Sequence, residues 1–158
     1  MIKSINVFDL DGVLIDSTHR YRVGEDGRID LAYWRANEHR AYHDTLMPLH
    51  HTYLELLRDP EVYVCVATAR ELREPDDSFI RDKLTQPPHI ISRKIGDCRS
   101  GGVIKVAGLN KLLSLRQFDN VETMVVWEDN HSYLKHICDA FMERYNVRGQ
   151  YIPSNQGH

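Results

Sequence analysis

Short apolar runs alternate with amphipathic stretches along the chain. Five of these runs are rich in β-branched or aromatic residues and have the length of buried strands. The predicted strands are residues 2–8, 61–67, 89–92, 123–127 and 147–152. Between them, apolar residues recur at three- and four-residue spacing, which predicts amphipathic helices. The predicted helices run from a cap at Asp44 or Thr45 to Asp59, and over residues 75–84, 103–115 and 132–145.

The alternation of strand and helix predicts an α/β fold, in which a mainly parallel sheet has helices on both faces. We expect a single domain over residues 1–158. In such sheets ligands bind beyond the carboxyl ends of the strands. Each of the first four predicted strands ends in a polar cluster: Asp9 with Asp11, Thr68 with Arg70, Ser92 with Arg93, and Glu128 with Asp129. The chemistry is therefore expected at one edge of the sheet.

Residues 18–60 are predicted to form a small flap or helical insertion within this domain. The stretch Gly24–Gly27 lies between short alternating segments, which indicates a hairpin or an irregular flap. Asp30 is placed to cap a helix that contains Trp34. The segment is too short for a large cap domain.

Composition and charge exclude several classes of protein. The chain has 20 Lys and Arg against 23 Asp and Glu, a net charge of −3, so it has no overall basic field for nucleic acid. No apolar stretch approaches the roughly 20 residues of a membrane helix, and Asp9 and Asp11 interrupt any signal-peptide core. The three cysteines lie far apart, which is typical of a reducing compartment. We expect a cytoplasmic protein without a membrane segment.

Asp9 and Asp11 follow the first predicted strand directly. Strand alternation would place both carboxylates on one side of the chain. Two such charges 4 Å apart repel each other by about 4 kcal/mol at an effective dielectric constant of about 20. A divalent cation is the usual compensation. Gly12, the next residue, suits a sharp turn that lets a ligand approach the backbone.

The stretch from Asp9 to Ser17, Asp-Leu-Asp-Gly-Val-Leu-Ile-Asp-Ser, resembles the first motif of the haloacid dehalogenase (HAD)-like phosphohydrolases. The resemblance implies a Rossmann-like fold. It also implies that Asp9 attacks phosphorus and that Asp11 is the general acid and base. In this superfamily a Thr or Ser after a later strand holds the phosphoryl group through its hydroxyl and a backbone N–H, and Thr68 fits that position.

Arg70 completes a Thr-x-Arg sequence that also resembles several of these phosphatases. Its planar fork could clamp a phosphate, although an ion pair with Glu71, Glu74 or Asp76 is the alternative. The superfamily further requires a lysine, for which Lys105 and Lys111 compete. We favour Lys105 because it follows a Gly-Gly pair at the start of a predicted helix. Lys111 is nearly two turns further along and is expected to face solvent.

Glu128-Asp129-Asn130 matches the acidic motif that completes the metal site in the superfamily. We assign Asp129 as a metal ligand, together with Asp9 and the backbone carbonyl of Asp11, and leave open whether Glu128 or Asn130 takes part. Hard oxygen ligands favour Mg²⁺. Relatives that process nucleic-acid ends commonly have Arg at the position of Asn130.

The resemblance implies a Mg²⁺-dependent phosphatase that forms an aspartyl-phosphate intermediate. The substrate is expected to be a nucleotide or a nucleic-acid terminal phosphate, contacted by Gly12, Thr68, Arg70 and Arg20, with aromatic residues such as Trp34 nearby. The alternatives are a sugar-phosphate phosphatase and a non-catalytic module that binds a phosphorylated ligand. The chain also resembles small bacteriophage HAD-type phosphatases and the phosphatase domain of polynucleotide kinase-phosphatases. A phage-encoded protein would lie in the host cytoplasm. The tail, 152–158, could cover the site or fray.

Overall fold

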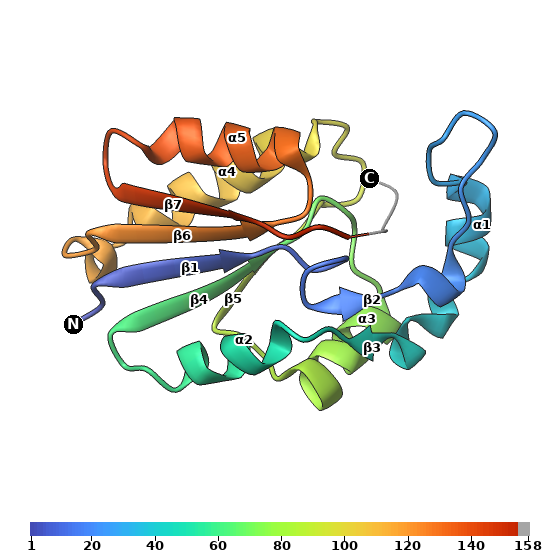
Figure 1. Ribbon diagram of the computed structural model, residues 1–158, viewed down its shortest axis with the longest axis horizontal. Helices are drawn as coiled ribbons and strands as arrows, with labels where there is room; N and C mark the ends of the chain where they lie inside the picture. The colour runs from blue at the N-terminus through green and yellow to red at the C-terminus, as the bar shows by residue number, and fades with distance from the viewer. Residues whose placement is uncertain (155–158) are drawn as a thin grey trace.

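A computed structural model describes residues 1–154 of the chain. Its centre is a five-stranded parallel sheet in the order β5-β4-β1-β6-β7 (Figure 1). The strands are β1 (Ser4–Phe8), β4 (Val62–Ala67), β5 (His89–Ile91), β6 (Thr123–Glu128) and β7 (Asn146–Tyr151). This arrangement confirms the predicted α/β fold, and it places β1 between β4 and β6. The polar residues that follow these three strands therefore meet at one edge.

Helices cover both faces of the sheet (Figure 1). One face carries α4 (Gly101–Leu113) and α5 (His131–Phe141). The opposite face carries α2 (His50–Leu57) and α3 (Glu74–Phe79), which continues into the π-helical turn η3 (Ile80–Leu84). Within residues 1–154, no helix combines the length and the apolar content that crossing a bilayer requires.

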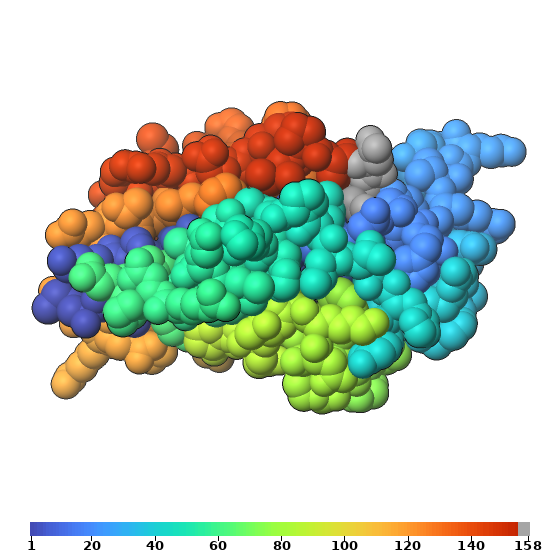
Figure 2. Space-filling view, turned by 60° about the horizontal axis from the view of Figure 1, so that its bottom comes forward, coloured from blue at the N-terminus to red at the C-terminus, as the bar shows by residue number. Residues whose placement is uncertain are grey.

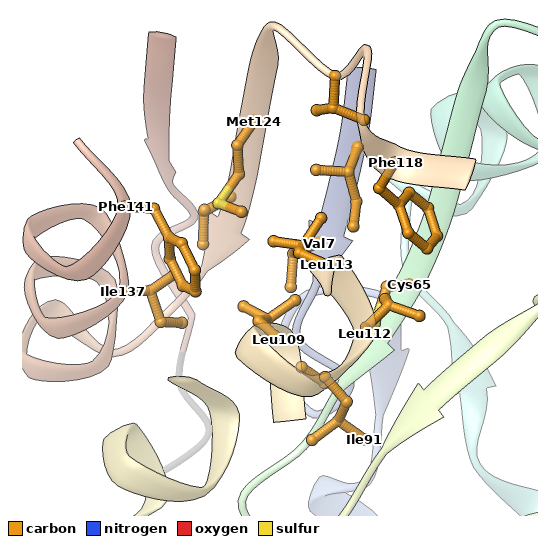
Figure 3. Packing of buried hydrophobic residues seen from close by; sticks show 14 of the residues in the cluster. Val7, Cys65, Ile91, Leu109, Leu112, Leu113, Phe118, Met124, Ile137 and Phe141 are labelled. Carbon is orange, nitrogen blue, oxygen red and sulfur yellow. The ribbon is translucent and has the colours of Figure 1, made fainter. Parts of the chain in front are cut away.

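The alternation of β1 divides its side chains between two hydrophobic cores. Ile5 and Val7 belong to the core beneath α4 and α5, which Figure 3 shows with Leu109 and Phe141. Phe8 belongs to the opposite core and stacks on Trp127 at a ring-centroid distance of 5.5 Å. Asp9 follows in the register of Ile5 and Val7, so its carboxylate turns toward α4. The same alternation that buries β1 therefore aims the first aspartate.

Residues 18–46 form a flap beyond the carboxyl edge of the sheet. It contains η1 (Thr18–Arg20), α1 (Leu31–Ala36), η2 (Glu38–His43) and β3 (Thr45–Leu46), which pairs with β2 (Ile15–Asp16). An antiparallel bridge between Val23 and Ile29 favours the hairpin over the irregular flap, the two possibilities that the sequence left open. Asp30 caps α1 as predicted, because its side chain accepts a hydrogen bond from the Tyr33 N–H at 3.0 Å.

Several observed helix boundaries differ from the predicted ones. Asp44 and Thr45 do not cap α2, which begins at His50; Asp44 is bound by Arg20, and Thr45 lies in β3. The helices α4 and α5 begin one or two residues earlier than expected. Ser100 caps α4 and Asn130 caps α5, where the Asn130 side chain accepts a hydrogen bond from the Tyr133 N–H. Because polar residues cap them, these two helices start nearer the sheet edge than predicted.

Candidate active site

A cavity of about 570 Å³ lies at the carboxyl edge of the sheet. Its floor is formed by residues that follow β1 and β4, and its walls come from the flap and from α5. Asp9, Asp11, Thr68, Arg70, Trp34 and Tyr133 are among its lining residues. The volume falls within the range of small-molecule sites. In Figure 2 the flap residues, light blue to cyan, gather at one end of the molecule.

Asp9, which lines the cavity, forms a buried cluster with Lys105 and Glu128. The Lys105 ammonium donates to Asp9 Oδ1 at 2.9 Å and to Glu128 Oε2 at 2.6 Å. The Lys105 side chain is completely buried, whereas Lys111 is exposed near the end of α4. The structure therefore places Lys105, rather than Lys111, beside the first aspartate.

Burial and neighbouring charge act in opposite directions on this cluster. Burial raises the pKa of the Asp9 carboxyl well above its ordinary value, Lys105 lowers it, and the acidic neighbours Glu128 and Asp129 raise it again. Burial likewise raises the pKa of Glu128, against the effect of Lys105. Burial would lower the pKa of Lys105, but Asp9 and Glu128 together raise it. Burial therefore opposes ionisation of the Asp9 and Glu128 carboxyl groups, whereas Lys105 favours it.

The carboxylates fit a divalent cation. Asp9, Glu128 and Asp129 each offer an oxygen, and these three oxygens lie within 4.8 Å of one another. Asp9 Oδ2 and Glu128 Oε1 are buried and accept no hydrogen bond from the residues that the structure describes. Three carboxylates and one ammonium leave two negative charges, and hard oxygen donors suit Mg²⁺. The side-chain oxygen of Asn130 caps α5, so this residue has a structural role that does not depend on a metal.

Asp11 is held differently from Asp9. Its carboxylate receives a two-pronged contact from Arg70, with Nε to Oδ2 at 2.6 Å and Nη2 to Oδ1 at 3.3 Å, and a hydrogen bond from the Ser17 hydroxyl. Gly12 has a φ of +83°, the left-handed conformation that glycine adopts without strain. The turn therefore sends the two aspartates to different partners, although both line the cavity.

Thr68 and Arg70 both lie at the cavity. The Thr68 backbone N–H donates to the Ile91 carbonyl at 2.8 Å, so it extends the sheet ladder. The Thr68 hydroxyl accepts from the Arg70 N–H at 3.4 Å. The Arg70 guanidinium also bonds Asp76, which is one of the ion pairs weighed from the sequence. Arg70 is thus at the site and is already engaged there with two carboxylates.

Arg20, expected to bind substrate, lies elsewhere. Its side chain is completely buried, and its guanidinium donates to both oxygens of Asp44, at 2.9 and 3.0 Å. Trp34 covers it, with the guanidinium carbon 4.1 Å from the ring centroid. Arg20 is not among the cavity-lining residues. Through its bonds to Asp44, the buried Arg20 side chain anchors the short segments of the flap.

Tyr133 is a cavity residue that the sequence did not single out. Its ring lies against Lys105, whose ammonium is 5.1 Å from the ring centroid, and it contributes to the wall of the cavity. Its position depends on the Gly-Gly start of α4. A Cβ on Gly101 would lie 2.5 Å from Tyr133 Cζ and 2.6 Å from the Ala69 Cβ. Only knowledge of the helix packing could have revealed this contact.

We expect Gly101→Ala to damage both stability and activity. The added methyl group would push Tyr133 and the Thr68–Arg70 loop apart, and overpacking of this kind costs about 1–3 kcal/mol of unfolding free energy. Urea unfolding and steady-state kinetics measure the two effects. Val103→Ala, a partly exposed position in the same helical turn, is the matched control. A Gly101→Ala protein as stable and active as the wild type would contradict the close packing.

The last described residues lie over the acidic cluster. The Ile152 N–H donates to the Glu128 carbonyl, and the Ser154 hydroxyl donates to Asp129 Oδ2 at 2.6 Å. Of the two possibilities considered for the tail, covering the site or fraying, residues 152–154 therefore follow the first. Residues 155–158 lie outside the described part of the chain.

A family model described as bacteriophage T5 5′-deoxynucleotidase matches residues 1–97 of the chain. This match includes Asp9, Asp11, Thr68 and Arg70, whereas Lys105 and the acidic pair at the end of β6, Glu128 and Asp129, lie beyond it. No curated protein matches the sequence.

Solved structures resemble the whole fold at low sequence identity. A chain of the Pnkp1/Rnl/Hen1 complex matches with a TM-score of 0.61 and 18% identity over 97% of this chain, which spans only 47% of that one. The HAD domain of the effector Lem4 from Legionella pneumophila gives 0.60 and 10%, covering 99% of this chain and 88% of that one. A HAD-superfamily hydrolase from Geobacter sulfurreducens gives 0.57 and 13%, covering 89% and 86%. The chain therefore has a HAD-like fold, and by the match over residues 1–97 it belongs to the bacteriophage T5 5′-deoxynucleotidase family.

Proposed function

We propose that the protein is a Mg²⁺-dependent phosphatase that hydrolyses nucleotide phosphate monoesters through an aspartyl-phosphate. The observation that carries the proposal is the pairing of Lys105 with Asp9 Oδ1, because it leaves Asp9 Oδ2 without a hydrogen-bond partner among the described residues. A carboxylate with one oxygen held by a cation and the other oxygen unbonded is suited to nucleophilic attack. This arrangement lies at the floor of a cavity large enough for a nucleotide.

In the first step Asp9 Oδ2 attacks phosphorus, and the bond between phosphorus and the leaving oxygen breaks. Asp11 gives its proton to the leaving oxygen, and the product alcohol departs. The Thr68 hydroxyl and the Lys105 ammonium face the negative charge of the transferring phosphoryl group. The first step ends with the phosphoryl group on Asp9.

In the second step water attacks the phosphorus of the aspartyl-phosphate. Asp11, now a carboxylate, takes the proton of that water, and the bond between phosphorus and Asp9 breaks. Phosphate leaves, and Asp9 is again a carboxylate. Arg70 donates to both oxygens of Asp11 and so supports the ionised state that this step requires.

The cation would be held by Asp9, Asp129 and the backbone carbonyl of Asp11, with Glu128 close enough to contribute an oxygen. When bound, Mg²⁺ supplies positive charge that offsets the acidic cluster and the phosphate oxygens. A divalent-ion titration of the purified protein, followed by calorimetry and by thermal unfolding, tests this part. No binding of Mg²⁺ or Mn²⁺ would contradict it.

The walls of the cavity favour a nucleotide over a sugar phosphate. Tyr21 and Trp34 line it, their ring centroids 6.3 Å apart, together with the apolar side chains of Ile29 and Leu31. Such surfaces stack against a planar base, whereas a sugar phosphate offers no aromatic face. The name of the family, 5′-deoxynucleotidase, points in the same direction. The flap, residues 18–46, would therefore supply the base-binding wall.

A substrate comparison tests the proposed function. Phosphate release is measured with Mg²⁺ for nucleoside and deoxynucleoside 5′-monophosphates, for oligonucleotides phosphorylated at the 5′ or 3′ end, and for ribose 5-phosphate. We expect the mononucleotides to have the highest kcat/KM. Preference for ribose 5-phosphate would replace the proposal with a metabolite phosphatase. Binding without turnover of any monoester would indicate a non-catalytic module.

Trp34→Leu is expected to raise KM for nucleotides about tenfold, because base–aromatic stacking contributes about 1–3 kcal/mol per base. The kcat/KM for ribose 5-phosphate should change little, since that substrate has no base. Tyr33→Leu is the matched control. Tyr33 is on the same helix but packs against Arg22 and is not among the cavity-lining residues. Equal losses on both substrates would show that Trp34 supports the structure of the flap and does not stack on the base.

A further inference from the structure

Five charged residues form a continuous buried network behind the cavity. Arg70 bonds Asp11 and Asp76, and Arg20 bonds Asp76 and Asp44. All five have little or no exposure, with Arg70 the most exposed at 17% of its side chain. The network crosses from the loop after β1 to the loop after β4, then to α3 and the flap. Buried ion pairs contribute little net stability, so their arrangement calls for another explanation.

Asp76 is at the centre of this network. Its Oδ1 accepts from Arg70 Nη1 at 3.0 Å and from Arg20 Nη2 at 3.4 Å, while Oδ2 accepts from the Arg73 N–H at 2.9 Å. A helix cap needs only the last of these three contacts. The other oxygen is shared by two guanidinium groups, and the side chain is only 4% exposed.

Asp76 and Asp11 together fix the plane of the Arg70 guanidinium. Nε and Nη2 meet the two oxygens of Asp11, and Nη1 meets Asp76 on the opposite side of the group. A planar fork held at both ends cannot rotate without breaking contacts. Trp34 covers the outer surface, with the Arg70 guanidinium carbon 5.2 Å from its ring centroid. Asp11 therefore takes its orientation from Arg70 together with the Ser17 hydroxyl, and Arg70 is held in turn by Asp76.

We propose that Asp76 is a positioning residue: acting through Arg70, it holds the Asp11 carboxyl group at the angle required for proton transfer to the leaving oxygen. Arg20 supports Asp76 from behind and joins it to the flap through Asp44. The proposal rests on the proposed function, because it assumes that Asp11 serves the leaving group. Asp76 touches no reacting atom, and its effect depends on the Arg70 fork.

Two substrates separate this role from a general structural one. Loss of a nucleotide 5′-oxygen requires protonation, whereas p-nitrophenolate leaves without it. The value of kcat/KM reports the steps through departure of the leaving group. In Asp76→Asn we expect kcat/KM for the nucleotide to fall about tenfold or more, and kcat/KM for p-nitrophenyl phosphate to fall less than about twofold. The ratio of the two values does not depend on how much protein is folded.

Asp77→Asn is the matched control, because Asp77 is the next residue of α3 and is exposed. It should leave both values unchanged. In an Arg70→Lys background, where the fork is absent, adding Asp76→Asn should alter the ratio by less than about twofold, since coupled residues are not additive. If Asp76→Asn fails to fold, Arg20→Lys provides a second test. It keeps the charge but loses the fork, and a shift of about threefold in the same direction is expected.

Equal losses on both substrates in Asp76→Asn, or a full additional effect in the Arg70→Lys background, would overturn the positioning role. Absence of turnover by the wild-type protein would instead overturn the proposed function. The two failures are therefore distinguishable.

Discussion

Asp9→Asn is expected to remove phosphate release almost completely, by about 10⁴-fold or more, because the amide cannot form the aspartyl-phosphate. The fold should persist. Asn has the same shape, and Lys105 keeps its bond to Glu128. Burial raises the pKa of Asp9, which means that the folded protein holds the charged form at a cost. Removing that charge should leave the melting temperature unchanged or higher.

Acid-quenched single turnovers with a nucleotide labelled on its phosphate test the covalent step directly. The wild-type protein should retain label that hydroxylamine releases, and Asp9→Asn should retain none. Asp59→Asn, an exposed aspartate before β4, serves as the control and should behave as the wild type. Substantial turnover by Asp9→Asn would contradict its assignment as the nucleophile.

Lys105→Met should destabilise the protein strongly in the absence of divalent ions. It leaves Asp9 and Glu128 buried without their cation, and breaking a buried pair in this way costs about 3–5 kcal/mol. For a chain of this size, the melting temperature should fall by roughly 6–20 °C. Mg²⁺ should recover part of the loss, because it restores positive charge beside the same carboxylates. Activity should remain very low.

Thermal unfolding in EDTA and in MgCl₂ measures both effects. Lys111→Met, on the exposed part of the same helix, should change neither. Adding Glu128→Gln to Lys105→Met should recover stability in EDTA, since one of the uncompensated charges is then absent. If Lys105→Met is as stable as the wild type without metal, the acidic cluster does not depend on the ammonium.

Local sequence patterns predicted most of the fold. The strands around the site consist of β-branched and aromatic residues, and their alternation or continuous apolarity is visible without any tertiary information. Asp44 shows where this approach fails. It has the composition and position of a helix cap, but its carboxylate is bound by Arg20, which lies 24 residues earlier in the chain. A contact of that separation has no local signal, and tertiary structure prevailed over capping preference.

The candidate site divides in the same way. Asp9, Thr68, Lys105 and Asp129 each follow a strand or begin a helix, so their convergence could be predicted from topology. Their individual roles remain predictions. Tyr133 could not be found, because its position depends on how closely α4 approaches α5. Asp76 was considered only as an ion-pair partner of Arg70, and its second contact, with Arg20, depends on the rotamers of the two arginines. Arg20 was misplaced because an arginine near a motif has the same sequence signature whether it meets substrate or a buried carboxylate.

The position of β1 in the middle of the sheet also determines when the site can form. Lys105 lies 96 residues from Asp9 in the chain, and Trp127, which joins the carboxyl end of β6 to β1, lies 121 residues from Asn6. Contacts of such separation form late, because the entropy of closing long loops must be overcome first. During synthesis, a chain whose residue 128 has not yet left the ribosome already contains Asp9. It still lacks Glu128 and Asp129, the acidic partners of Asp9. The order of translation therefore delays the complete cluster until most of the protein has been made.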